Sequence, residues 1–223
     1  MVGSYDGTVE WWFKSYGLPL LEIYQRLREI IEKYGVAHEK RQLNSGEWSD
    51  YYCNLKSLLL TPVIAWEIAR LMYPYILESG VAGVGGLETG AIPLTDAICS
   101  ISTVGSPLPG FFVRKANKSY GIPDRVVGGL CADGPLIRPG RDLAVVEDVV
   151  SRGGSALEVV RAVRAEGCEV KLVMGVLERH EGGGKQFRDI GIPFKRLFYT
   201  TEDGRVRLDE ETNQRLREGL TRS

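Results

Sequence analysis

Short apolar runs alternate with helical segments through the middle and second half of the chain. Runs with the length and composition of buried strands occupy residues 81–84, 111–113, 143–146 and 170–177. Between them, helical patterns cover residues 92–101 and 155–166. Strands and helices that alternate at this spacing form βαβ units. We therefore expect an α/β fold, a parallel sheet flanked by helices on both faces.

The N-terminal part of the chain precedes this alternation. Apolar residues recur at helical spacing over residues 20–34, between Pro19 and Gly35, and a second helix is expected to begin at Pro62. This part is predicted to form an N-terminal helical extension. Residues 1–17 carry an aromatic cluster, which we interpret as an arm packed on the domain. No segment rich in Pro, Gly or Ser divides the 223-residue chain, so a single domain is predicted.

Composition excludes several classes of protein. Lys and Arg number 28 and Asp and Glu 29, so the basic excess typical of a nucleic-acid binder is missing. No apolar run reaches the roughly 18 residues of a membrane span. The N-terminus lacks the basic and apolar regions of a signal peptide, and the cysteines form no CxxC pair. The sequence thus predicts a cytoplasmic protein without nucleic-acid or membrane partners.

The most informative segment covers residues 143–156. Its apolar strand is expected to end in two acids, Glu147 and Asp148, before a turn that contains Ser and Gly and opens a helix. Free N–H groups at a helix start bind phosphate, and glycines let the backbone approach it. The adjacent carboxylates can accept hydrogen bonds from sugar hydroxyls. The pattern indicates a phosphorylated sugar as ligand, and two consecutive acids after a buried strand disfavour an ordinary strand-to-helix turn.

This segment resembles the phosphoribosyl pyrophosphate (PRPP) signature of type I phosphoribosyltransferases. That signature is an apolar strand followed by two acids, two apolar residues, a Ser/Thr-rich turn and a helix. The segment differs from a P-loop, because no GK[ST] follows, and from a GxGxxG dinucleotide turn.

Further stretches match one branch of these enzymes, in the correct order. Residues 43–52 (LNSGEWSDYY) resemble the LKSGxxSPYY element of orotate phosphoribosyltransferases, residues 83–94 their pyrophosphate loop, and residues 112–121 (FVRKANKSYG) their RKxxKxHG hood loop. Arg179 stands where that family carries an arginine in the orotate site. From about residue 20 to residue 200, the chain is identified as a member of this family.

The resemblance implies the type I phosphoribosyltransferase fold, with a flexible hood loop over residues 114–129. It also implies a reaction in UMP synthesis: orotate and PRPP give orotidine 5′-monophosphate and pyrophosphate, with Mg²⁺ as cofactor. Positive charge develops on the ribose while negative charge grows on the pyrophosphate, so positioning and electrostatics carry the catalysis. A homodimer is implied as well, in which the hood lysine acts in the neighbouring subunit's site.

The matched motifs also imply the site residues. Lys118, Lys115 and Asp148 are implied as catalytic. The residues implied to bind PRPP are Glu88, Thr89, Gly90, Arg114, Lys115, Lys118, Glu147, Asp148, Ser151, Arg152, Gly153, Gly154 and Ser155. Those implied to bind orotate are Asn44, Tyr51, Tyr52, Ser151 and Arg179. Mg²⁺ is expected to arrive with PRPP, and Asp148 is its one candidate ligand from the protein.

Three positions depart from the family pattern. Asn44 replaces a lysine, Tyr120 replaces a histidine, and Arg152 occupies a place usually held by a small or Thr-like residue. Two alternatives therefore stay open. One is transfer to another base, because specificity depends on the details of the pocket. The other is a PRPP- or nucleotide-binding regulator without catalysis, although the retained lysines and acids favour activity.

Overall fold

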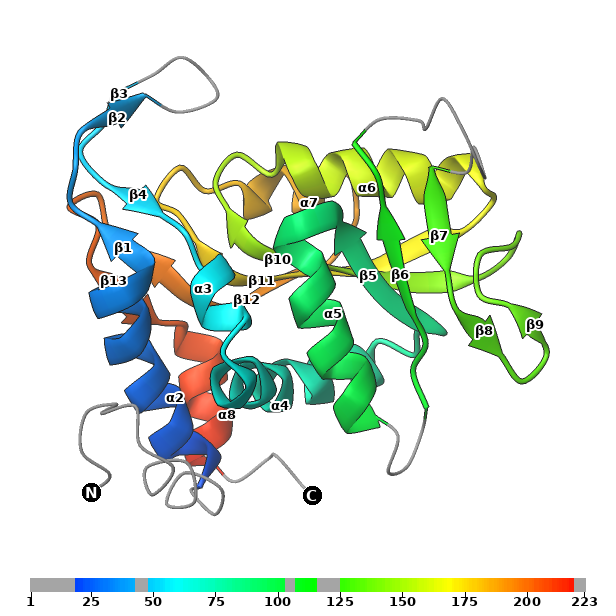
Figure 1. Ribbon diagram of the computed structural model, residues 1–223, viewed down its shortest axis with the longest axis horizontal. Coiled ribbons are helices and arrows are strands. Elements are labelled where there is room, and N and C mark those ends of the chain that lie inside the picture. Colours follow the sequence, from blue (N-terminus) through cyan, green and yellow to red (C-terminus); the bar gives the residue numbers. More distant parts are fainter. Residues whose placement is uncertain (1–18, 43–47, 103–106, 116–124, 219–223) are drawn as a thin grey trace.

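The computed structural model describes residues 19–42, 48–102, 107–115 and 125–218, and a seven-stranded sheet forms its centre (Figure 1). The strand order is β13-β12-β11-β10-β5-β6-β7. The central strands pair in parallel, whereas β7 and β13 pair antiparallel at the two edges. The strands are β5 (Gly83–Leu87), β6 (Gly110–Val113), β7 (Val126–Gly128), β10 (Asp142–Val150), β11 (Glu169–Glu178), β12 (Phe194–Thr200) and β13 (Val206–Leu208).

Three short antiparallel ribbons lie outside this sheet. They pair β1 (Val36–Ala37) with β4 (Tyr52–Cys53), β2 (Arg41–Gln42) with β3 (Trp48–Ser49), and β8 (Leu130–Cys131) with β9 (Gly134–Pro135).

Helices cover both faces of the sheet, α4 and α5 one face and α6 and α7 the other (Figure 1). Strand β10 serves both cores, because its side chains alternate. Ala144 and Val146 belong to the core that contains α4 and α5, and Leu143 and Val145 to the core that contains α6. The helices are α2 (Leu20–Ile30), which continues as a π-helix (Ile31–Gly35), α3 (Lys56–Leu59), α4 (Pro62–Glu78), α5 (Glu88–Ser102), α6 (Gly154–Ala165), α7 (Gly184–Asp189) and α8 (Glu210–Arg217).

The order in which the chain adds strands to the sheet changes direction between the parallel neighbours β5 and β10. From β5 the chain passes through α5 to β6, and from β10 it passes through α6 to β11, so the two connections move toward opposite edges. Neighbouring parallel strands with this arrangement open a crevice at their C-terminal ends, which is where ligands bind in such sheets.

The predicted α/β sheet with helices on both faces is confirmed, and several details are corrected. The sheet is antiparallel at its edges instead of parallel throughout. The strand predicted at 143–146 does not end before the acids, because β10 pairs with β11 as far as Val150. The hood loop is shorter than residues 114–129, because Val126 and Val127 pair with β6 as strand β7.

The C-terminal elements β12, β13 and α8 were not predicted. Strand β12 carries Lys195 and Arg196 near its start, and they interrupt the apolar run that sequence patterns detect. Both charges are paired in the structure, Lys195 with Glu211 and Arg196 with Glu178 and Asp209. Asp209 also caps α8, because its side chain accepts a hydrogen bond from the Thr212 N–H.

Two predicted features lie outside the described residues. They are the arm at residues 1–17 and the hood-loop stretch 116–124. Among the helices that the structure describes, none has the length and apolar character needed to cross a membrane.

Candidate active site

A cavity of about 380 Å³ opens at the crevice between β5 and β10. Its walls come from β4, α3, the start of α5, the second residue after β6, the end of β10, the turn into α6 and the residues after β11. The predicted site residues that line it are Tyr52, Thr89, Gly90, Lys115, Glu147, Asp148, Ser151, Arg152, Gly153, Gly154, Ser155 and Arg179. The fold thus brings most of the predicted residues to one place.

The other predicted residues are placed differently. Glu88 and Arg114 stand beside the cavity without lining it, and Tyr51 lies behind Arg179. Asn44 and Lys118 lie outside the described residues.

One end of the cavity is a turn followed by a helix start. Gly153 has a φ of +75°, in the left-handed region that favours glycine, and α6 begins at the next residue. No side chain among the described residues caps this helix, so its first N–H groups are available to an anion, and the helix dipole favours negative charge there. This end of the cavity has the construction of a phosphate site.

Two buried acids form the floor. Glu147 is 7% exposed and Asp148 4%. Burial and the neighbouring Asp148 carboxylate raise the pKa of Glu147 well above its usual range. Gly90 packs directly against this pair: a Cβ there would come within 2.9 Å of Asp148 Oδ1, so the start of α5 reaches the acids only with a glycine at this position.

The donor set of the acids fits Mg²⁺. Glu147 Oε2 and Asp148 Oδ2 are buried and have no hydrogen-bond partner among the described residues. Mg²⁺ prefers such oxygens and is usually held by one or two carboxylates together with substrate phosphates. In the part of the chain that the structure describes, no group of three His, Cys, Asp or Glu side chains could hold a metal by itself. The two acids therefore suit a Mg²⁺ ion that binds with a diphosphate.

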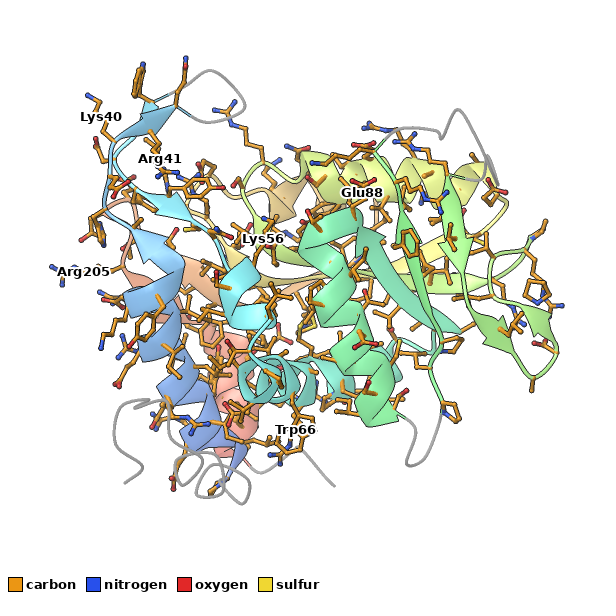
Figure 2. The ribbon with its side chains drawn as sticks, viewed as in Figure 1. Lys40, Arg41, Lys56, Trp66, Glu88 and Arg205 are labelled. Carbon is orange, nitrogen blue, oxygen red and sulfur yellow. The ribbon has the colours of Figure 1, made fainter. Side chains whose placement is uncertain are left out.

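Cations face the acids from two elements. Lys56 Nζ on α3 lies 3.6 Å from Asp148 Oδ2, and Lys115 stands two residues after the end of β6. The Lys115 N–H donates to Glu88 Oε1 over 2.8 Å, which ties the end of β6 to the start of α5. Glu88 holds a φ of +27°, a strained conformation for a residue with a side chain. Lys56 and Glu88 lie on the same side of the sheet (Figure 2).

The opposite end of the cavity is built around Arg179, which is 3% exposed. Its Nη2 donates to Ser49 Oγ at 2.9 Å and to the Tyr51 carbonyl at 3.4 Å. The Tyr51 ring lies under the guanidinium, 4.7 Å from Cζ to the ring centre. The Tyr51 hydroxyl points away to His180 Nδ1 and Thr200 Oγ1, at 2.5 and 2.8 Å. Tyr51 therefore supports Arg179 from behind.

Among the residues that the sequence analysis missed, three contact the charged groups of the site. They are Lys56, Ser49 and Glu181, whose Oε1 lies 3.2 Å from Arg179 Nη2. Ser49 lies inside a recognised motif and the other two within a few residues of a recognised motif or residue, so nearness to these was the available signal.

A second hollow of about 680 Å³ lies on the other side of Arg179, against residues 199–203. Besides Arg179, the arginine among the described residues that line this hollow is Arg196, which is already paired with Glu178 and Asp209. We place the chemistry in the first cavity, where an uncapped helix start, acids and lysines meet.

Comparisons with known proteins identify the family of the chain. No family model matches the chain. An orotate phosphoribosyltransferase from a Bradyrhizobium species is 39% identical over 178 residues, which cover 79% of this chain and 95% of the relative. The chain belongs to the orotate phosphoribosyltransferase family. This membership confirms the predicted family and makes the protein a pentosyl-transferring enzyme of pyrimidine synthesis.

Solved structures give the same result. The crystal structure of Mycobacterium tuberculosis orotate phosphoribosyltransferase in complex with Fe(III) dicitrate has a TM-score of 0.67 and 30% identity, and the match covers 82% of this chain and 99% of that one. The same enzyme in complex with PRPP has a TM-score of 0.62 and 28% identity, with 78% of this chain and 94% of that chain covered.

Proposed function

We propose that the protein transfers the phosphoribosyl group of PRPP to orotate, with Mg²⁺, as a cytoplasmic homodimer. The observation that carries the reaction is the content of one cavity. An uncapped helix start lies at one end, a buried guanidinium at the other, and two acids with two lysines lie between them. The helix start suits a 5′-phosphate, the acids and lysines suit a ribose with its diphosphate, and the guanidinium suits an anionic base.

The ribose phosphate is held mainly by backbone groups. The N–H groups of residues 153–156 bind the 5′-phosphate, and the hydroxyls of Ser151 and Ser155 add donors. The two acids engage the ribose hydroxyls. Both acids can accept hydrogen bonds from hydroxyls, and the raised pKa of Glu147 favours its protonated form, which can also donate one. Asp148 also stabilises the positive charge that develops on the ring as the glycosidic bond breaks.

The departing pyrophosphate is neutralised by Lys115 and Lys56, with Lys118 and Arg114 of the hood loop as further cations. The Thr89 and Gly90 backbone approaches it from the start of α5. Bound Mg²⁺, held by the diphosphate oxygens with Glu147 and Asp148, would supply further neutralising charge to the leaving group. Arg179 pairs with the orotate carboxylate at the other end, and Tyr52 borders the same space.

The test is an assay with PRPP, Mg²⁺ and a panel of bases. We expect turnover with orotate and at most trace turnover with uracil. Turnover with a different base alone would establish the alternative specificity. Tight PRPP binding without turnover of any base would establish a regulator.

The homodimer has its own test, which uses two variants that are each nearly inactive. Lys118→Ala and Asp148→Asn are mixed under conditions that exchange subunits. If Lys118 acts in the neighbouring subunit, each mixed dimer regains one intact site, and random pairing restores about a quarter of wild-type activity per site. No recovery despite demonstrated exchange would mean that Lys118 serves its own subunit or is not the catalytic cation.

A further inference from the structure

Arg179 already has a carboxylate partner in the cavity wall. Its Nη2 lies 3.2 Å from Glu181 Oε1, and the two side chains are 3% and 13% exposed. Both residues line the cavity. Orotate would bring a second carboxylate to the same cation, so the place of Glu181 in the reaction requires an explanation.

The donors of Arg179 show where the two carboxylates compete. A carboxylate that binds a guanidinium side-on uses Nε and one Nη nitrogen together. Nε of Arg179 is buried and has no hydrogen-bond partner among the described residues. Nη2 beside it already contacts Ser49, the Tyr51 carbonyl and Glu181. A substrate carboxylate at Nε and Nη2 therefore meets Glu181.

Electrostatics prevent both carboxylates from staying. A buried guanidinium without a counter-charge is strongly unfavourable, so Glu181 stabilises Arg179 while no substrate is present. Two carboxylates on one cation repel each other, so one of them must leave or take up a proton.

Glu181 is the carboxylate that can leave. Its Oε2 has no hydrogen-bond partner among the described residues, and His180 Nδ1 lies 3.6 Å from it. Gly182 follows with a φ of +70°, and a Cβ there would meet no atom within 4 Å, so the turn is open directly after Glu181. Its release therefore breaks the ion pair with Arg179 and little else.

We propose that Glu181 is a specificity-determining residue, an internal counter-ion of Arg179 that is displaced only by a ligand with its own carboxylate. The inference rests on the proposed function, in which Arg179 binds orotate. A neutral base leaves the Arg179–Glu181 pair intact and gains nothing from the guanidinium. The product still carries the carboxylate, so the return of Glu181 to Arg179 helps the product to leave.

The test compares two nucleotides that differ only in this carboxylate, orotidine 5′-monophosphate and uridine 5′-monophosphate. Calorimetric titration measures the Kd of each, with no turnover and no added metal. Glu181→Gln should tighten binding of orotidine 5′-monophosphate about 10-fold, a coupling of ordinary size, and should not tighten binding of uridine 5′-monophosphate. Glu181→Asp, which keeps the charge, should return the Kd toward the wild-type value.

Two controls separate this effect from general electrostatics. Glu202→Gln makes the same change of charge at an exposed position outside the cavity and should leave both Kd values unchanged. In an Arg179→Gln background, Glu181→Gln should no longer tighten binding of orotidine 5′-monophosphate.

The inference is overturned if Glu181→Gln weakens binding of orotidine 5′-monophosphate, leaves it unchanged, or shifts both nucleotides equally. The proposed function is tested separately by the wild-type protein. If the wild type neither prefers orotidine 5′-monophosphate nor turns over orotate, the function fails as well.

Discussion

One end of the cavity is formed mainly by backbone groups and the other by side chains. The phosphate end consists of consecutive residues, 151–156, whose backbone N–H groups are presented by a turn and a helix start. The base end consists of side chains: Arg179 is held by Ser49, which lies 130 positions away in the sequence. A site made of backbone tolerates changes of side chain, whereas a site made of side chains depends on each partner. The acids lie between the two ends and serve both.

The largest loss of activity is expected for a substitution of the acids, which lie between the two ends. Asp148→Asn removes the carboxyl group proposed to lie beside the reacting carbon and leaves both ends in place. We expect kcat to fall about 1000-fold, the size typical for loss of one preorganised electrostatic group, with a smaller change in the KM for PRPP. Steady-state kinetics measure both constants.

The matched control is Asp142→Asn, at the half-exposed start of the same strand. It should retain wild-type kcat, and both variants should show wild-type circular dichroism and thermal melting. A kcat within a few-fold of wild type in Asp148→Asn would remove this residue from the catalytic machinery.

The next largest loss of activity is expected for a substitution at the base end. Arg179→Gln removes the guanidinium that would bind the orotate carboxylate. We expect kcat/KM for orotate to fall about 100-fold, as for loss of a charge-assisted pair of hydrogen bonds, and the KM for PRPP to change little. The slow reaction with uracil should change much less. Equal losses of kcat/KM with orotate and with uracil would show that Arg179 does not bind the orotate carboxylate. Arg205→Gln, at an exposed position, is the control.

This difference between consecutive residues at one end and distant side chains at the other also decides how much of the site could be predicted from the sequence. The phosphate end could be predicted because the two acids, the turn glycines and the helix start follow each other along the chain. The base end could be predicted only in part. Arg179 was found through a resemblance, but no local pattern connects Ser49 or Glu181 to it, because the fold alone brings β3 and the end of β11 together. Strand β12 was missed for a similar reason, since the partners of its charges come from β11, from the residue before α8 and from α8 itself.

The burial of the acids has a measurable cost in stability. The pKa of Glu147 is raised in the folded protein, chiefly by burial and then by the Asp148 carboxylate. Above the ordinary Glu pKa of about 4.3, the unfolded chain releases this proton while the folded protein keeps it, so stability falls as pH rises toward the folded pKa. Glu147→Gln removes this loss.

We therefore expect Glu147→Gln to raise the free energy of unfolding at pH 7 by about 1–2 kcal/mol, within the usual range for a single substitution, while activity falls. The gain over wild type should vanish below about pH 4, where the carboxyl is protonated in both states. Denaturant titrations from pH 4 to pH 8 measure the difference. A gain that does not depend on pH, or one that the exposed Glu166→Gln reproduces, would contradict this account.

The smallest effects compare the two ends directly, with one serine at each. Ser49 Oγ accepts from Arg179 Nη2 and donates to the Tyr51 carbonyl at 2.8 Å, so Ser49→Ala takes a positioning contact from the guanidinium. We expect the KM for orotate to rise about 10-fold, as for loss of a hydrogen bond to a charged group. Ser155→Ala removes a hydroxyl from the phosphate end, where backbone N–H groups remain, so the KM for PRPP should rise only about 2-fold. Each variant should leave the other substrate's KM unchanged. If Ser155→Ala proved the more damaging of the two, the phosphate end would depend on side chains as much as the base end does.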